Sequence, residues 1–423
     1  MALHKNFING EWVEGVDAKA NINPSDVSDV VGEFSHADRK QTESAIAAAQ
    51  AAFSGWSATT PQQRADILEA TGAELLARRD EIGRLLSREE GKPLANGIAE
   101  TMRAAQIFKF YAQEALRVEG RSLASVRAGV DVTITREPLG VVGIICPWNF
   151  PIAIPAWKVA PALAYGNTVV LKPADLVPAS SWALVEILSR VGLPKGVLNL
   201  VMGRGSIVGQ TLLESRGVNA ISFTGSVETG AKVAMACSAR GAKYQLEMGG
   251  KNPLIVMDDA NIDAAVAASI DGAFYQTGQR CTASSRLIVH SKVHDSYVEK
   301  MVNAMKALKV DHALKDGTQI GPVIDEAQMT QDEKYIGIGR DEGGALAWGG
   351  ERLNRDTKGH FLSPALFVNT RNDMRINREE VFGPVAAVIK VESYDEALAV
   401  ANDTAFGLSS GIFTSSLKHA TDF

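Results

Sequence analysis

Between Leu139 and Leu246 the sequence alternates regularly between short apolar runs rich in β-forming residues and helical segments. The expected strands are 140–146, 168–172, 197–201, 220–223 and 244–246, and the expected helices are 152–164, 180–191, 206–215 and 227–239. Because each strand is followed by a helix, the pattern predicts a parallel sheet covered by helices on both faces. Ligands of such sheets bind at the carboxyl ends of the strands.

The segments around this stretch extend the prediction. Residues 37–117 are helical by pattern, with breaks expected at Gly55, Pro61 and residues 91–93, and a second α/β unit is expected from Gly249. Its predicted elements are strands 253–257, 286–290, 385–391 and 408–413 and helices 262–275, 293–308 and 394–402, followed by a helix that starts near Ser415.

Two short β-rich segments stand apart from these units. Asn9 and Gly10 lie between alternating residues and predict a hairpin turn in an extended N-terminal arm. Residues 119–138 predict a two-stranded ribbon. Because an isolated ribbon is marginally stable in water, we expect this one to pack on another subunit.

Composition narrows the class of protein. The chain has 423 residues, a net charge of -6 and no dense Lys/Arg run, which favours a small ligand over nucleic acid. No apolar stretch approaches the roughly 18 residues of a membrane span, and no secretory leader is visible, so the cytoplasm is the expected compartment. Three widely spaced cysteines fit neither a disulfide framework nor a metal site.

Two glycine-containing loops follow strands and open helices. The loop with Gly203, Gly205 and Gly209 has a last gap one residue longer than the usual dinucleotide fingerprint. The loop Phe223-Thr224-Gly225-Ser226 offers backbone N–H groups and a hydroxyl where a pyrophosphate could bind. Turn formation and helix capping explain either loop equally well when it is considered alone.

Cys281 lies in the polar segment Gln276–Ala283, directly after a predicted helix. A lone cysteine is usually a small core residue. Here the neighbouring Arg280 would favour the thiolate, which is the form that attacks carbonyl carbons. The sequence therefore predicts a nucleophile at Cys281.

A thiolate that adds to a carbonyl needs an oxyanion donor and, if a thioester forms, a base that activates water. Asn149, in a Pro-bracketed turn, is the candidate donor, although a turn-forming role explains it equally. Glu247 is the candidate base, and burial near apolar groups would raise its pKa. A surface or salt-bridged glutamate is the alternative reading. Oxidation would also require a nicotinamide site.

Six motifs occur together in one order. They are Pro147-Trp148-Asn149-Phe150-Pro151, Lys172-Pro173-Ala174, Phe223-Thr224-Gly225-Ser226, Leu246-Glu247-Met248-Gly249-Gly250-Lys251, Gly278-Gln279-Arg280-Cys281 and Glu379-Glu380-Val381-Phe382-Gly383-Pro384. Through them the chain resembles the NAD(P)-dependent aldehyde dehydrogenase superfamily. The resemblance implies an α/β fold with a Rossmann-type cofactor domain at 1–118 and 139–248, a catalytic domain at 249–423 and an oligomerisation ribbon at 119–138.

The resemblance also implies roles for individual residues. Cys281 would be the nucleophile, Asn149 with the Cys281 N–H the oxyanion hole, and Glu247 the base, with Lys172 counted among the catalytic as well as the cofactor residues. Cofactor contacts are expected from Cys146, Pro147, Trp148, Lys172, Ala174, Asp175, Gly205, Gly209, Phe223, Thr224, Gly225, Ser226, Met248, Glu380 and Phe382. Substrate contacts are expected from Phe150, Trp157, Arg103, Arg280 and Thr282.

Cofactor and substrate preferences follow from charge. Asp175 would accept from a free ribose 2′-hydroxyl and repel a 2′-phosphate, which favours NAD slightly over NADP. Arg280 could hold the carboxylate of a short semialdehyde, although structural pairing with a protein acid is an equal alternative. By resemblance, α-ketoglutarate semialdehyde is the first expected substrate and succinate semialdehyde the next, with a homodimer or homotetramer as the expected assembly.

Two alternatives to this function stay open. The thioester could pass to coenzyme A, although Glu247 favours water as the acceptor, and a non-catalytic cofactor-binding protein is possible, although Cys281, Asn149 and Glu247 together argue against it. Members of the resembled family continue for several tens of residues past the position of Phe423. The printed chain is therefore expected to be a piece of a longer chain or a truncated product.

Overall fold

The computed structural model describes residues 3–423, which form two compact units. Unit 1 contains the N-terminal segment up to Ile22, Val30–Glu89 and Gly97–Glu247, and unit 2 contains Asn23–Asp29, Glu90–Asn96 and Met248–Phe423. Two short excursions from the first half of the chain thus belong to unit 2. The alternating pattern did not indicate these excursions.

A seven-stranded sheet forms the centre of unit 1, in the order β12-β11-β8-β9-β10-β2-β3. The five strands β12, β11, β8, β9 and β10 run parallel, and β2 joins β10 antiparallel. The bounds are β8 Val141–Ile145, β9 Thr168–Lys172, β10 Leu198–Leu200, β11 Ala220–Thr224, β12 Lys243–Glu247, β2 Asn6–Ile8 and β3 Glu11–Val13. The parallel sheet predicted from the alternation is confirmed.

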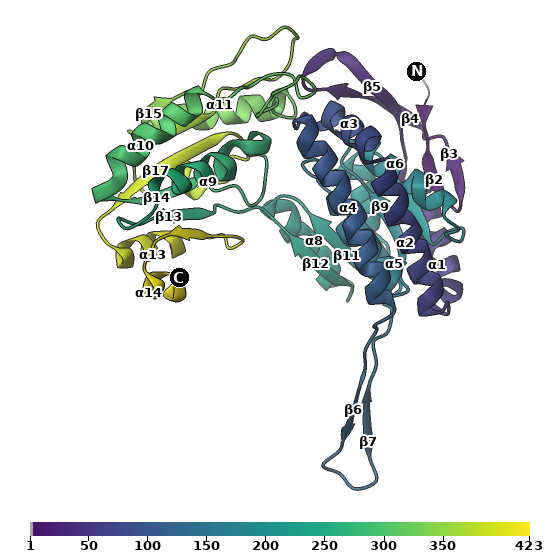
Figure 1. The fold of residues 1–423 in the computed structure, drawn as a ribbon. Coiled ribbons are helices and arrows are strands. Elements are labelled where there is room, and N and C mark those ends of the chain that lie inside the picture. Colours follow the sequence, from purple (N-terminus) through teal and green to yellow (C-terminus); the bar gives the residue numbers. More distant parts are fainter. Residues whose placement is uncertain (1–2) are drawn as a thin grey trace. The chain divides into compact units, whose positions relative to one another are not determined.

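Helices flank this sheet (Figure 1), and Leu163 and Leu184 of these helices are buried in one apolar cluster with Leu171 of β9. The helices are α1 Arg39–Ser57, α2 Pro61–Ala77, α3 Arg79–Glu90, α4 Leu94–Ala115, α5 Ala153–Ala164, α6 Pro178–Arg190, α7 Gln210–Glu214 and α8 Val227–Ala239, with a π-helical turn at Gly205–Gly209 before α7. The break expected at Gly55 is wrong, because α1 runs through it. The next helix starts instead at Pro61, where Thr60 and Gln63 form a capping box.

The N-terminal hairpin is confirmed. Strands β2 and β3 pair antiparallel, and Asn9 and Gly10 both have positive φ, 54° and 81°, as a two-residue hairpin turn requires. A further three-stranded sheet has the order β1-β5-β4, with β1 Leu3–His4, β4 Asp17–Asn23 and β5 Asp26–His36.

The predicted ribbon is also present. Strands β6 Arg121–Ala124 and β7 Asp131–Ile134 pair antiparallel, and all eight of their residues are exposed. Figure 1 shows this ribbon projecting from the rest of unit 1. Its role in oligomerisation remains a prediction.

Unit 2 is built on a six-stranded sheet in the order β15-β16-β17-β14-β13-β18, parallel except for the β15–β16 pair. The strands are β13 Pro253–Val256, β14 Arg286–His290, β15 Ala345–Trp348, β16 Ala365–Thr370, β17 Val385–Val391 and β18 Gly411–Phe413. The helices are α9 Ile262–Phe274, α10 Ser291–Lys306, α11 Glu326–Asp341, α12 Arg375–Arg378, α13 Tyr394–Asn402 and α14 Leu417–Asp422.

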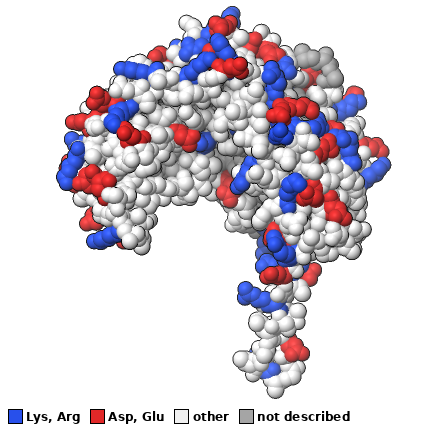
Figure 2. Space-filling model, viewed as in Figure 1, with Lys and Arg blue, Asp and Glu red and all other residues white. Residues whose placement is uncertain are grey.

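The surface carries charge of both signs. Figure 2 shows Lys and Arg interspersed with Asp and Glu over the visible face, without a continuous field of one sign. Within residues 3–423, no helix is long and apolar enough to cross a membrane.

Candidate active site

The segment that carries Cys281 begins with an abrupt change of direction after α9. Gln276, Thr277 and Gly278 follow one another with φ values of 54°, 59° and 65°, in the left-handed region that side chains disfavour. A Cβ on Gly278 would lie 2.3 Å from the carbonyl oxygen of Gly383. Glycine is therefore required at position 278 for both reasons, and the turn leaves Cys281 partly exposed in a loop.

Hydrogen bonds hold this loop on both sides of the turn. The Thr277 hydroxyl donates to the Gly321 carbonyl at 3.1 Å, and the Gln279 side-chain oxygen accepts from the Ile324 N–H at 2.9 Å. The buried Asn252 amide donates to the carbonyls of Cys281, at 2.7 Å, and Ala283, at 3.0 Å. The sequence reasoning missed Asn252, whose only signal was its place beside the Gly249-Gly250 pair.

Arg280 is bound to the end of α9. Its guanidinium donates to the carbonyls of Gly272, at 2.9 Å, and Asp271. Burial lowers the pKa of Arg280, while Asp271 and Cys281 act in the opposite direction. A structural use of Arg280 therefore exists in the fold, although its partners are backbone carbonyls and not the protein acid considered from the sequence. Thr282 is exposed.

The segment with Glu380 and Phe382 lies against the Cys281 loop within unit 2. Glu380 Oε1 accepts from the Gly250 N–H at 3.1 Å, and a Cβ on Gly249 would lie 1.9 Å from the same carboxylate. Burial raises the pKa of Glu380, opposed by the Gly250 N–H and Lys251. Phe382 has φ 63°, a strained conformation for a bulky residue and one that clusters at functional sites.

Helix α11 packs against the segment that carries Glu380 and Phe382. Gln328 and Gln331 donate to the Val381 carbonyl at 3.1 and 2.8 Å. A Cβ on Gly383 would lie 2.1 Å from Asp332 Oδ1, so the Asp332 carboxyl packs directly on the glycine. Burial raises the pKa of Asp332 to about 8. Its Oδ2 has no hydrogen-bond partner among residues 3–423.

In unit 1, Asn149 follows β8 in a segment that neighbouring helices fix. Glu100 of α4 accepts from the N–H groups of Ile152 and Ala153, both at 3.1 Å, at the start of α5. The Ser181 hydroxyl of α6 donates to the Pro151 carbonyl at 2.9 Å. Asn149 itself is 3% exposed. A buried amide on a segment held by two helices is well placed to present a fixed donor.

Lys172 ends β9 and is 4% exposed. Its Nζ donates to the Pro173 carbonyl at 2.8 Å, and burial lowers its pKa, opposed by Asp175 and Cys146. The Asp175 carboxylate lies 3.6 Å from Lys19 Nζ of β4. Cys146 is buried, and burial raises the pKa of its thiol to about 12, which disfavours the thiolate form.

The two glycine loops of unit 1 differ in their surroundings. A Cβ on Gly205 would meet nothing within 4 Å, so the backbone there is open to a ligand, and Gly209 lies near the Lys172 side chain. At Gly225, a Cβ would lie 2.6 Å from the Phe223 ring. The Ser226 hydroxyl accepts from the Thr229 N–H at 3.3 Å and caps α8. A helix start with a hydroxyl and free N–H groups suits a phosphate.

Glu247 is the last residue of β12 and is exposed. The burial expected for Glu247 from the sequence is therefore not found. Its Oε1 accepts a hydrogen bond of 2.6 Å from the Gln245 side-chain amide. Sequence reasoning missed Gln245.

Helices α4 and α5 enclose a cavity of about 380 Å³ in unit 1. The guanidinium carbon of Arg103 lies 5.9 Å from the Trp157 ring centroid, a cation–π distance. Arg103 makes no ion pair with any acid in the described part of the chain. The cavity is lined by Arg103, Gln106, Ile107, Phe110, Tyr111 and Trp157. Two of the expected substrate residues thus share one cavity.

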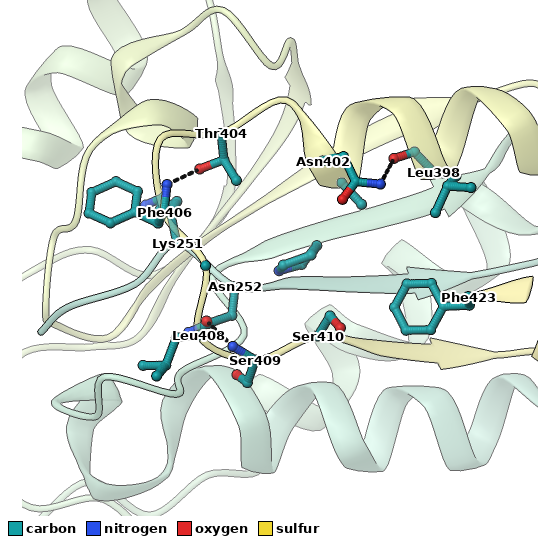
Figure 3. Close-up of a pocket in the computed structure, with 13 residues that line it drawn as sticks. Lys251, Asn252, Leu398, Asn402, Thr404, Phe406, Leu408, Ser409, Ser410 and Phe423 are labelled. Carbon is teal, nitrogen blue, oxygen red and sulfur yellow. Dashed lines mark hydrogen bonds between the residues drawn. The ribbon is translucent and has the colours of Figure 1, made fainter. Parts of the chain in front are cut away.

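A second cavity, of about 260 Å³, lies in unit 2 between α13 and the chain that leads to β18 (Figure 3). Lys251 and Asn252 line it, and burial lowers the pKa of Lys251 to about 7. None of the catalytic, cofactor or substrate residues predicted from the sequence lines this cavity.

Each unit, taken by itself, offers groups that suit part of a dinucleotide. Unit 1 offers the open backbone at Gly205, the start of α8 at Ser226 and the buried Lys172 at a strand end. Unit 2 offers the Glu380 carboxylate, which is fixed by the Gly250 N–H and suits a ribose hydroxyl.

The profile of the Aldehyde dehydrogenase family matches residues 12–423. The chain therefore belongs to the aldehyde dehydrogenase family, whose members are NAD(P)-dependent oxidoreductases. The expected enzyme class and the expected fold are both confirmed.

Three comparisons give the detail. The alpha-ketoglutaric semialdehyde dehydrogenase of Bacillus subtilis (strain 168) is 45% identical over 422 residues, which are 99% of this chain and 86% of that protein. The crystal structure of betaine aldehyde dehydrogenase from Staphylococcus aureus in complex with NAD+ has a TM-score of 0.97 and 34% identity, over 99% of this chain and 84% of that one. An E. coli NADP dependent enzyme has a TM-score of 0.96 and 35% identity, over 99% and 87%.

The Asp332 carboxyl gives a prediction for pH-dependent stability. Because its folded pKa of about 8 is raised above the ordinary value of 3.8, its contribution is fully present at low pH and is lost as pH rises from about 4 to 8. Asp332→Asn keeps the shape and cannot ionise. The free energy of unfolding of the variant should match that of the wild type near pH 4 and exceed it by about 5 kcal/mol near pH 8, as measured by urea unfolding.

Asp341→Asn, at an exposed position of the same helix, is the matched control and should retain the pH slope of the wild type. If the free energies of unfolding of Asp332→Asn and the wild type change in parallel across this pH range, then the raised pKa of Asp332 is contradicted.

Proposed function

We propose that this aldehyde dehydrogenase oxidises a short aldehyde that carries a carboxylate, with α-ketoglutarate semialdehyde as the first candidate. The observation that carries the proposal is the α4–α5 cavity with its unpaired Arg103. The name of the 45% identical relative supports the same substrate. Succinate semialdehyde, or a broad range of aldehydes, is the alternative within the enzyme class.

In the proposed reaction, the Cys281 thiolate attacks the aldehyde carbon, and the Asn149 amide and the Cys281 N–H donate to the oxygen that becomes negative. The carbon–hydrogen bond of this adduct would then break, with a bound nicotinamide dinucleotide as the hydride acceptor, and the Cys281 sulfur would be left in a thioester. Glu247 then takes a proton from the water that hydrolyses the thioester. Lys172, Ser226 and Glu380 are the proposed holders of the adenine-side ribose, a phosphate and the second ribose.

Arg103 is the stronger candidate for the carboxylate anchor. The Arg280 guanidinium already donates to two carbonyls at the end of α9, which reduces the donors it can offer. Arg103, by contrast, is exposed and makes no ion pair with any described acid. An arginine over an aromatic ring can bind a carboxylate through its fork. It would repel a cationic substrate such as betaine aldehyde.

For the cofactor, we propose a slight preference for NAD. The Asp175 carboxylate would accept from the 2′-hydroxyl and repel a 2′-phosphate, although the neighbouring Lys19 reduces the net negative charge there. The comparisons include both an NAD+ complex and an NADP dependent enzyme, so the family accommodates either.

The proposed assembly is a homodimer or homotetramer in which another subunit covers the β6–β7 ribbon. Leu123 and Ile134 on this ribbon are 50% and 48% exposed. The proposed compartment is the cytoplasm, where cysteines stay reduced; Cys146, Cys237 and Cys281 form no disulfide within residues 3–423.

Formation of NADH or NADPH, followed by absorbance with a panel of aldehydes, tests the function. α-Ketoglutarate semialdehyde should be oxidised without coenzyme A, and Cys281→Ala should abolish turnover, while Cys237→Ala, at a buried cysteine of α8, should retain it. A requirement for coenzyme A would favour the acylating alternative. Cofactor binding without turnover of any aldehyde would favour a non-catalytic protein.

Substitution of Arg103 by leucine tests the substrate class. Because a charged hydrogen bond contributes about 1.5–3 kcal/mol, KM for an acidic semialdehyde should rise roughly 10- to 100-fold, while KM for an alkyl aldehyde of similar length changes little. Arg103→Lys keeps the positive charge, so its KM for the acidic semialdehyde should rise less than that of Arg103→Leu. Equal effects on both aldehydes would remove Arg103 as the anchor.

Substitution of Asp175 by serine tests the cofactor preference. Removing the carboxylate removes its repulsion of a 2′-phosphate and leaves Lys19 and Lys172 nearby, so the ratio of kcat/KM for NADP to that for NAD should rise about tenfold. Asp17→Ser, at the exposed start of β4, is the control. An unchanged ratio would show that Asp175 does not distinguish the ribose 2′-hydroxyl of NAD from the 2′-phosphate of NADP.

A further inference from the structure

A chain of hydrogen bonds in unit 1 runs from a buried lysine to the Glu247 carboxylate. It begins at Lys158 of α5, which is 8% exposed. Lys158 Nζ donates to the Ser222 hydroxyl at 2.9 Å and to Gln245 Oε1 at 3.2 Å. Burial lowers the pKa of Lys158, while Cys146 and Glu247 act in the opposite direction.

The sheet register aligns the other residues of this hydrogen-bond network. Ser222 of β11 and Gln245 of β12 are directly opposite one another, and the Ser222 hydroxyl donates to Gln245 Oε1 at 2.8 Å. Gln245 and Glu247 are two residues apart on one strand, so their side chains leave the same face of the sheet. The chain ends with the 2.6 Å bond from Gln245 Nε2 to Glu247 Oε1.

The direction of the Gln245 amide follows from its partners. Its oxygen accepts from two donors, Lys158 and Ser222, so its NH₂ group must point the other way, toward Glu247. An amide fixed in this manner can hold one carboxylate oxygen of Glu247 and leave the other to accept a proton. Without it, an exposed glutamate would sample several rotamers.

We infer that Gln245 is a positioning residue for Glu247 and is required for efficient thioester hydrolysis. The inference rests on the proposed role of Glu247 as the base. The amide donor orients the carboxylate, which takes a proton from water in the proposed reaction. Lys158 and Ser222 act through Gln245 by fixing its orientation.

The experiment separates the first turnover from later ones. In Gln245→Leu, NADH from the first turnover should form at the wild-type rate, within about twofold, because Gln245 acts after that step. Steady-state kcat should fall about tenfold, because a misplaced group loses much of its catalytic effect. The acidic limb of the kcat–pH profile should move to higher pH, since a donor to the carboxylate is lost.

Two further variants make the result specific. Gln245→Glu places a second carboxylate beside Glu247 and should move the acidic limb further than Gln245→Leu. Gln113→Leu, at an exposed position of α4, should keep the wild-type kcat and profile. A purely structural role for Gln245 would not move the pH profile.

The outcomes distinguish this inference from the function on which it rests. If Glu247→Gln keeps the wild-type kcat, then the proposed base is wrong. If Glu247→Gln slows only the turnovers after the first, while both Gln245 variants keep the wild-type kcat and pH profile, then the base is retained and the positioning role of Gln245 is overturned. A first-turnover rate that falls together with kcat in Gln245→Leu would also overturn it.

Discussion

The close approach of Gly278 to the Gly383 carbonyl is the contact on which the unit 2 site depends. A Cβ at Gly278 would lie 2.3 Å from that oxygen, so the two segments can pack only if the first carries no side chain there. Three consecutive left-handed residues bring the backbone to this point. Since Asp332 packs on the other side of Gly383, the Cys281 loop, the Glu380 segment and α11 form one continuous arrangement. Hydrogen bonds at Thr277 and Gln279 maintain it.

In unit 1 the positions of the proposed functional side chains depend on strand ends and on register. Lys172 ends β9 and Glu247 ends β12, as expected for a parallel sheet whose ligands gather at the carboxyl edge. The regular pairing of β11 with β12 also fixes which side chains meet, because it sets Ser222 opposite Gln245. Polar groups of separate elements can thereby form one ordered network, in which each donor has a defined acceptor.

Elements with strong periodicity could be predicted from the sequence, and β9, β14 and β17 agree with the prediction at both ends. The segment around Cys281 and the glycine loops could also be recognised in the sequence. Glycine marks places where the backbone needs an unusual conformation or a close approach, and cysteine marks a possible reactive thiol. The excursions of Asn23–Asp29 and Glu90–Asn96 into unit 2 could not be predicted, since tertiary packing decides them. The hydrogen bonds that the Gln245 side chain accepts from Lys158 and Ser222 depend on residues distant in sequence, which no local pattern records.

The cavity beside Arg103 is built entirely from α4 and α5 of unit 1. Neither helix carries the nucleophile or its supporting loop, which belong to unit 2. Mutations that reshape this cavity can therefore accumulate without disturbing the strained turn before Cys281. Such separation makes the scaffold evolvable. Natural variants could change substrate preference through mutations on two helices, while selection keeps the chemistry unchanged. A laboratory library of mutations restricted to the same lining residues would use the same separation.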